Sequence, residues 1–169
     1  MIESLYTLAS ASGESPIEYP TWAEAGWYLL GIIFFLLLNA FFVASEFAIV
    51  KVRPSQIEGE LEKKPRRAGI SKRVVSNLDG YLSANQLGIT IASLALAFLG
   101  EPFIEKLVGP SLLKTGMGEE WIKIITFLTA MFSFTFLHVV IGELLPKSIA
   151  IRKSLATTLV IARPLHLFY

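Results

Sequence analysis

The stretch AGWYLLGIIFFLLLNAFFVASEFAIV, residues 25–50, decides the fold class, because it holds 26 residues with Glu46 as its only charge. A helix of about 20 apolar residues is long enough to cross the hydrocarbon core of a bilayer. Two further uncharged stretches follow, residues 80–100 with 21 residues and residues 124–142 with 19. We therefore predict an all-α membrane protein with three transmembrane helices. Their predicted bounds are residues 25–52, 80–100 and 122–147.

The composition agrees with a membrane protein and excludes several other classes. Of the 169 residues, 53% are apolar and 17% are charged, which is more apolar and less charged than an average soluble domain. The formal net charge of +1 gives no basic excess, so we expect no nucleic-acid binding. No cysteine is present, so any metal would need oxygen or imidazole ligands. No Ser-His-Asp, HExxH or phosphate-loop pattern occurs, and we expect no enzyme; an intramembrane hydrolase would have only serines and His138 to use.

The charges outside the apolar stretches predict the orientation in the cell membrane. Residues 51–79 hold eight basic and four acidic residues, and four basic residues but no acid follow Glu143. Residues 1–24 hold four Glu and no Lys or Arg, which also excludes a signal peptide with a basic start. Because basic loops stay in the cytoplasm, we expect the N-terminal segment outside and the C-terminus inside.

The connecting segments are expected to form short helices along the membrane. Residues 53–79 predict two short amphipathic helices, 54–62 and 68–78, broken at Lys64 and Pro65 and lying on the anionic inner surface. A solvated basic loop is the alternative. Within the external segment 101–121, we expect a short helix that Gly109 and Pro110 end. Residues 148–169 contain an apolar run too short to cross, and we expect a helix there that wraps the cytoplasmic side as a belt.

Pro146 predicts a kink and an ion-binding carbonyl in the third transmembrane helix. Proline lacks the N–H that would bond to the carbonyl four residues earlier, so the carbonyl of Gly142 is freed beside the carboxylate of Glu143. Such oxygens inside a membrane need protein, water or an ion as a partner. With hydroxyl and amide oxygens from the other two helices they would form the ligand set of a hard cation. The alternative is a kink satisfied by Ser, water or a neighbouring helix.

Other polar groups lie at similar depth in the first two helices. Asn39, Ser45 and Glu46 lie in the first, and Ser83 and Asn85 begin the second. Ser45 alone could bond to a carbonyl of its own helix, Glu46 could pair with a nearby basic residue, and the amide of Asn85 could bond to a neighbouring helix. His138 lies about one turn before Gly142, where a hydrogen bond to a neighbour is the alternative to a ligand role.

Three blocks of the sequence resemble the transmembrane domain of the CorC/CNNM magnesium transporters, once called hemolysin-related proteins. They are NAFFVASEFAIVKVR (39–53), YLSANQLGITIASLALAFLGEP (81–102) and HVVIGELLPKSIAI (138–151), in this order. The resemblance implies a homodimer of three-span protomers with belt helices, which exports Mg²⁺ from the cytoplasm in exchange for Na⁺. It also implies cytoplasmic CBS domains after the membrane domain, so this chain looks like the membrane module without them.

The resemblance further implies a set of metal ligands. They are the Ser45 hydroxyl, oxygens of Ser83 and Asn85, the Gly142 carbonyl and the Glu143 carboxylate. Between Ser83 and Asn85 we favour Asn85, because an amide oxygen is the better ligand for Mg²⁺; this chain has Ile89 where many relatives carry an Asn.

We expect movement about Gly88, Gly142 and Pro146 to open the site outward, and supporting roles around the ligands for Glu46, His138 and Lys147. The alternative function is a Mg²⁺-binding membrane scaffold or regulator that transports nothing.

Overall fold

The computed structural model describes residues 18–169, which form helices and connecting turns without any strand. Three helical stretches are long and apolar enough to cross a membrane, as predicted. They are α2 (Trp22–Lys51), α5 (Leu78–Leu113), and a third made of α6 (Glu119–Leu137), the π-helix η1 (His138–Leu144) and α7 (Leu145–Arg152). The all-α fold with three spanning helices is therefore confirmed.

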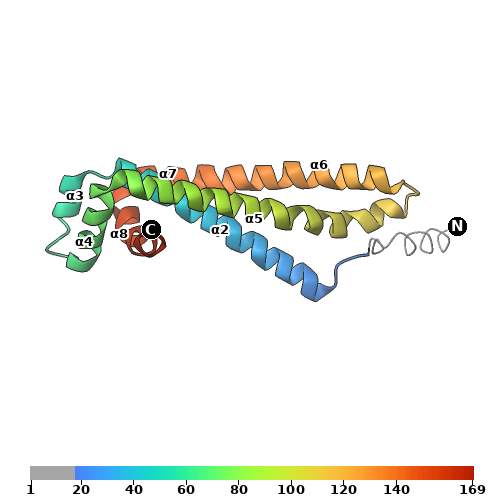
Figure 1. Ribbon diagram of the computed structural model, residues 1–169, viewed down its shortest axis with the longest axis horizontal. Coiled ribbons are helices and arrows are strands. Elements are labelled where there is room, and N and C mark those ends of the chain that lie inside the picture. The colour runs from blue at the N-terminus through green and yellow to red at the C-terminus, as the bar shows by residue number, and fades with distance from the viewer. Residues whose placement is uncertain (1–17) are drawn as a thin grey trace.

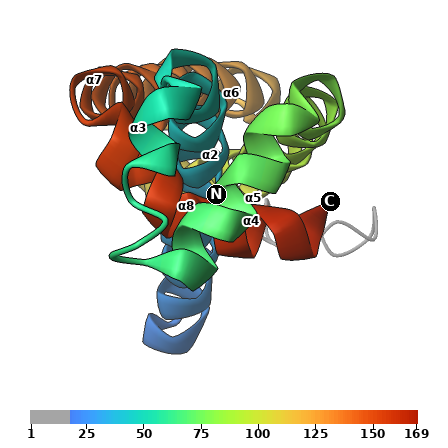
Figure 2. The ribbon, with the colours of Figure 1, turned by 90° about the vertical axis from the view of Figure 1, so that its left-hand side faces the viewer.

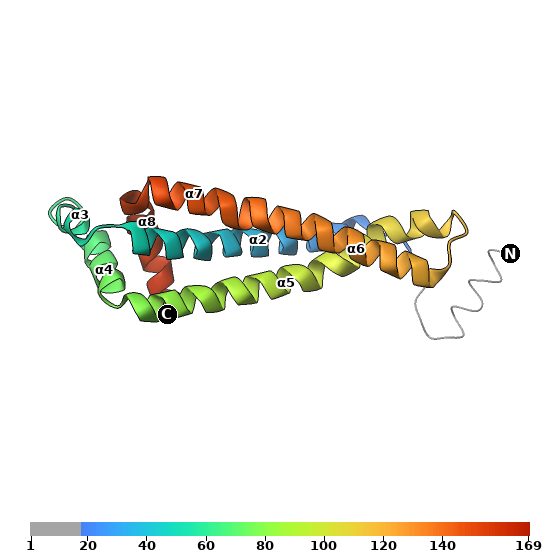
Figure 3. The ribbon, with the colours of Figure 1, turned by 90° about the horizontal axis from the view of Figure 1, so that it is seen from above.

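The three long helices lie side by side (Figures 1 and 3), and in the view of Figure 1 the N-terminal part of α2 slopes away from α6. Glycines bring them close together. A Cβ on Gly88 of α5 would lie 2.5 Å from the ring of Phe42 on α2, and one on Gly100 would lie 2.5 Å from the ring of Phe134 on α6. Small residues at such crossings let membrane helices pack closely, because lipid offers no hydrophobic force to press them together.

The second spanning helix does not end at residue 100, and no separate short helix stopped by Gly109 and Pro110 follows it within residues 101–113, because α5 continues through Pro102 and Pro110 to Leu113. Tertiary packing explains the difference. Phe103 packs against the buried cluster of Ile32, Leu36 and Leu96, and both Gly109 and Pro110 are buried. Packing of this kind offsets the hydrogen bonds that prolines remove. The chain then turns over residues 114–118, where Gly116 has the left-handed φ of 81° that glycine adopts without strain.

The third stretch lacks a sharp kink at Pro146. Figure 3 shows α6 and α7 following nearly one line. The irregularity is instead the π-helix His138–Leu144, which lies directly before Pro146. Its wider turn changes the hydrogen-bond pattern at the point where Pro146 has no N–H to donate. The helix then continues to Arg152, so the belt helix α8 (Ser154–Phe168) begins six residues later than the expected start at residue 148.

At one end of the bundle, α3 (Pro54–Glu58), α4 (Pro65–Ser76) and α8 gather around the end of α2. The helix α4 begins at Pro65, three residues before the expected start at residue 68, because the first helical position needs no N–H. Figure 2 shows α8 lying across this end, beside α2 and α4. A buried cluster joins α8 to α2, α4 and α5, and its members are Phe42, Ile49, Val74, Tyr81, Ile161, Ala162 and Leu165.

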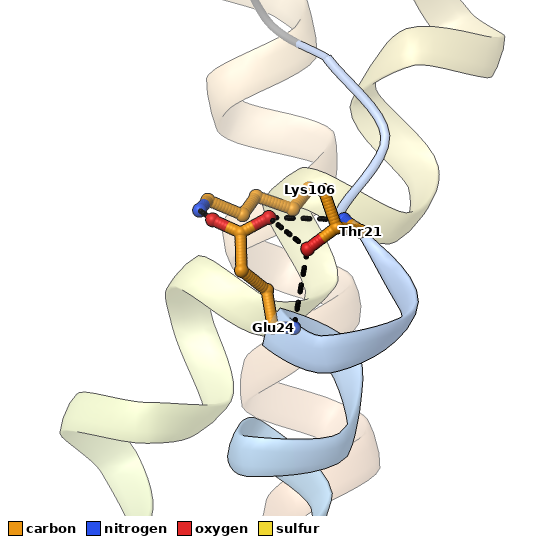
Figure 4. A network of polar contacts seen from close by, with 3 residues as sticks. All are labelled: Thr21, Glu24 and Lys106. Atoms are coloured by element: carbon orange, nitrogen blue, oxygen red, sulfur yellow. Dashed lines mark hydrogen bonds and ion pairs between the residues drawn. The ribbon is translucent and has the colours of Figure 1, made fainter.

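At the opposite end, a polar network fixes the start of α2 (Figure 4). The hydroxyl of Thr21 accepts a hydrogen bond from the backbone N–H of Glu24 at 3.3 Å, and the Glu24 carboxylate accepts one from the backbone N–H of Thr21 at 2.9 Å. Lys106 of α5 lies 3.2 Å from the same carboxylate. This capping box therefore also links α2 to α5. Thr21 and Glu24 are exposed and Lys106 is half-buried, so solvent screens the network and it adds little to stability.

Candidate ion-binding site

Asn39 connects the three spanning helices near their middle. Its side chain is fully buried on α2, and its Nδ2 donates a hydrogen bond of 3.0 Å to the carbonyl of Gly142 in η1. Its Oδ1 lies 3.4 Å from the hydroxyl of Ser93 on α5. One amide thus contacts polar groups on both other helices, in a place where unpaired polar groups are costly.

The Gly142 carbonyl is therefore occupied by a side chain of the neighbouring helix, which is the alternative left open for the Pro146 motif. Glycine is needed here because a Cβ would lie 2.9 Å from the Asn39 Nδ2. Sequence reasoning noted Asn39 as a polar residue in a membrane helix but did not place it in the site. The two residues are 103 positions apart, and no local signal links them.

Glu143 pairs with His138 across the π-helix. His138 Nε2 lies 2.9 Å from Glu143 Oε1, five residues along the chain. In an α-helix, residues four apart face each other, whereas the wider π turn brings residues five apart onto one face. The Glu143 side chain remains 45% exposed and the His138 side chain 18%. The Glu143 carboxylate therefore stays partly accessible although it pairs with His138.

Within the spanning helices, the fold leaves the buried amide of Asn85 without a partner; the buried hydroxyl of Thr158 on α8 also has none in the described part of the chain. Asn85 is fully buried on α5, and neither Nδ2 nor Oδ1 has a hydrogen-bond partner within residues 18–169. Leaving a buried amide unsatisfied costs about 1–3 kcal/mol. The unsatisfied Asn85 amide therefore marks a position where a bound ligand would supply the missing contact.

Ser45 lies at the level of Asn85 on the facing helix. The helices α2 and α5 run antiparallel, and Gly88 of α5 packs against Phe42 of α2. Asn85 lies three residues before Gly88 on α5, and Ser45 lies three residues after Phe42 on α2. Because the helices are antiparallel, both steps lead in the same direction, so Asn85 and Ser45 lie at one level. The buried Ser45 hydroxyl donates to the Phe41 carbonyl at 2.7 Å. Its oxygen therefore keeps its lone pairs for a further donor or a cation.

The remaining predicted residues lie around this cluster. Ser83 is exposed and its hydroxyl donates to the Asp79 carbonyl at 3.0 Å, which places it apart from the buried Asn85. Lys147 is exposed and its Nζ lies 4.4 Å from the ring centroid of Phe47. Glu46 is half-buried on α2. Gly88 lies within the unbroken α5 against the Phe42 ring, so the structure shows it as a packing contact.

The chemistry of these groups favours a hard cation held largely by neutral oxygens. Among residues 18–169, no group of three or more His, Asp or Glu side chains is arranged to hold a metal. Hydroxyl, amide and backbone oxygens with one carboxylate are ligands of Mg²⁺ and Ca²⁺. A cavity of about 270 Å³ lies between α5 and α6, and its lining includes His138 and Glu101.

These features define an integral membrane protein with three spanning helices around a buried polar cluster. The model of the cyclin M transmembrane N-terminal domain matches residues 30–169, and the chain belongs to this CNNM family. Its relatives include two Bacillus subtilis proteins, UPF0053 protein YhdT and UPF0053 protein YugS. Each is 48% identical over 141 residues, which cover 83% of this chain but 30% and 33% of the relatives. The chain thus spans about a third of the length of these relatives.

Proposed function

We propose that this chain forms the membrane part of a transporter that exports Mg²⁺ from the cytoplasm in exchange for Na⁺, by alternating access. The buried, unpartnered amide of Asn85 at the level of Ser45 carries the proposal. Its oxygen is available to a cation, and Mg²⁺ takes six oxygens in near-octahedral geometry. The family of the chain supports a transporter rather than an enzyme.

The ligands proposed for the bound ion are Ser45, Asn85, the Gly142 carbonyl and the Glu143 carboxylate, with Ser83 at the exposed edge. Two of these groups have protein partners in the present structure, since Gly142 accepts from Asn39 and Glu143 pairs with His138. Binding Mg²⁺ would exchange these contacts for metal ligation. That exchange couples the ion to the packing between α2 and η1, which is the kind of differential contact that alternating access requires.

We further propose the arrangement of the protein in the membrane. The basic end with α3, α4 and α8 faces the cytoplasm, and the loop at residues 114–118 faces outward. A homodimer would bury part of the apolar surface of α6, where Phe132 and Phe136 are each 68% exposed. In a longer protein, CBS domains would follow on the cytoplasmic side, as the resemblance implies.

Flux measurements test the proposed function directly. The purified chain is placed in proteoliposomes, and Mg²⁺ flux is followed with and without an opposing Na⁺ gradient. The variant Asn85→Ala should lose flux and weaken Mg²⁺ binding at least tenfold. Gln86→Ala is the matched control, because Gln86 is the adjacent amide and is exposed. Equal flux in Asn85→Ala and wild type would overturn the assignment of Asn85.

The carboxylate provides a second test of the same site. Glu143→Gln should weaken Mg²⁺ binding severely, because a single carboxylate supplies the negative charge among neutral ligands. Glu119→Gln, at the exposed start of α6, removes the same charge outside the site. Wild-type chain that shows no flux, while Mg²⁺ still raises its melting temperature, would contradict transport by this chain and support the scaffold alternative.

A further inference from the structure

A groove of about 690 Å³ opens between α4 and α8, at the end of the bundle where α8 lies across the helices (Figure 2). Buried contacts fix the relative position of its two walls. The Ser71 hydroxyl of α4 lies 3.4 Å from the Thr158 carbonyl of α8, and both residues are fully buried. Ala68, one turn earlier on α4, is also fully buried. Buried contacts between α4 and α8 therefore fix the shape of the groove.

Four arginines line the groove, three on α4 and one on α8. They are Arg66, Arg67, Arg73 and Arg163. All four are exposed, and none forms an ion pair within the described residues 18–169. The neighbouring lysines differ, because Lys72 lies 3.0 Å from Glu58 and Lys64 lies 3.2 Å from Glu60. The nearby carboxylates thus neutralise lysines and leave the arginines unpaired.

Unpaired guanidinium groups that share one groove favour a phosphate ligand. Each guanidinium presents a planar fork of N–H donors that matches two phosphate oxygens. The groove also includes Pro65 at the start of α4, whose first turn holds no acidic residue. The partial positive charge of a helix N-terminus adds to the arginines at this point.

The apolar part of the groove indicates whether the phosphate belongs to a phospholipid or to a water-soluble molecule. Leu159, Val160 and Pro164 of α8 line it together with Ile70 of α4, and Val160 is 63% exposed. A water-soluble phosphate would gain nothing from this surface, whereas an acyl chain would bury it. The helix α8 directly follows the end of the third spanning stretch, so the groove lies at the depth where the spanning helices end.

We propose that the groove between α4 and α8 binds the phosphate of an anionic phospholipid, with the arginines on the headgroup and Val160 against the acyl chain. The site would hold the belt helix at the membrane surface. It is independent of the ion site, because none of its lining residues is among the proposed Mg²⁺ ligands.

Native mass spectrometry of the purified chain in detergent, titrated with dioleoyl phosphatidylglycerol or dioleoyl phosphatidylcholine, tests this proposal. Phosphatidylglycerol should bind at least tenfold more tightly. The triple variant Arg66→Gln, Arg73→Gln, Arg163→Gln should lose at least tenfold in that affinity. Circular dichroism should show unchanged helix content, because the three side chains are exposed.

The matched control removes three positive charges from the same end but outside the groove, in the triple variant Lys51→Gln, Lys63→Gln, Lys72→Gln. It should keep its phosphatidylglycerol affinity within about twofold, since surface charge acts only through screened attraction. Equal losses in the two triple variants would show diffuse attraction and overturn the proposal. Displacement of the lipid by inorganic phosphate at equal concentration would also overturn it, in favour of a soluble phosphate ligand.

Discussion

At the scale of single residues, Asn39 contributes to stability through a hydrogen bond between two spanning helices. It is fully buried, and its Nδ2 is the partner of the Gly142 carbonyl at 3.0 Å. In Asn39→Leu that carbonyl would lose its partner, which we expect to lower the free energy of unfolding by about 1–2 kcal/mol. Thermal unfolding in detergent, followed by circular dichroism, measures the change.

Gln86→Leu is the control for this prediction, because it replaces an exposed amide of α5 with the same apolar side chain. Its melting temperature should remain close to that of the wild type. An Asn39→Leu protein as stable as Gln86→Leu would show that the Gly142 carbonyl finds another donor.

The residue scale also shows what local sequence can predict about the site. A serine in a membrane helix commonly bonds to its own helix, and Ser45 does so through the Phe41 carbonyl. The sequence also identified Gly142 as the carbonyl that Pro146 leaves without its usual donor. The donor itself, Asn39, could not be identified, because it lies on another helix and only the packing of α2 against η1 brings it there.

At the scale of helices, the contact between α2 and α5 depends on Gly88. A Cβ at this position would lie 2.5 Å from the ring of Phe42, which is itself 2% exposed and cannot move outward. Gly88→Ala should therefore lower the free energy of unfolding by about 1–3 kcal/mol, the usual cost of overpacking. Chemical denaturation in mixed micelles provides the measurement.

Gly26→Ala is the matched control for Gly88→Ala, because Gly26 also lies in a spanning helix but a Cβ there meets nothing within 4 Å. It should be neutral or slightly stabilising, since alanine is the better helix former. The double variant Gly88→Ala, Phe42→Leu should recover part of the loss by removing the ring. A Gly88→Ala protein as stable as Gly26→Ala would contradict the close packing of α5 against the Phe42 ring of α2.

Helix existence followed from the sequence, but helix ends and irregularities did not. Long runs without charges predict spanning helices because length and hydropathy alone decide whether a helix can cross a membrane. The continuation of α5 past Pro102 depends on Phe103 packing against residues of α2, which no local pattern contains. The π-helix His138–Leu144 likewise has no compositional signal, and its pairing of His138 with Glu143 appears only in the folded chain.

At the scale of the whole molecule, charge separates the two ends of the bundle. The basic residues of α4 and α8 gather at one end, and the other end holds the capping box of Thr21 with Glu24 and Lys106. The ion site lies between the ends, and the phospholipid groove lies at the basic end. The orientation in the membrane therefore determines which leaflet supplies the lipid.

The sequence contains no cysteine, so a thiol reagent would label only a cysteine that is introduced by mutation. Labelling of single introduced cysteines therefore tests the orientation. Thr115→Cys places the thiol in the turn between α5 and α6, and Lys63→Cys places it before α4; both positions are exposed. We expect a membrane-impermeant maleimide to label Thr115→Cys in intact cells, and Lys63→Cys only after permeabilisation, because basic segments stay in the cytoplasm. The reverse pattern would overturn the proposed orientation and would place the groove in the outer leaflet.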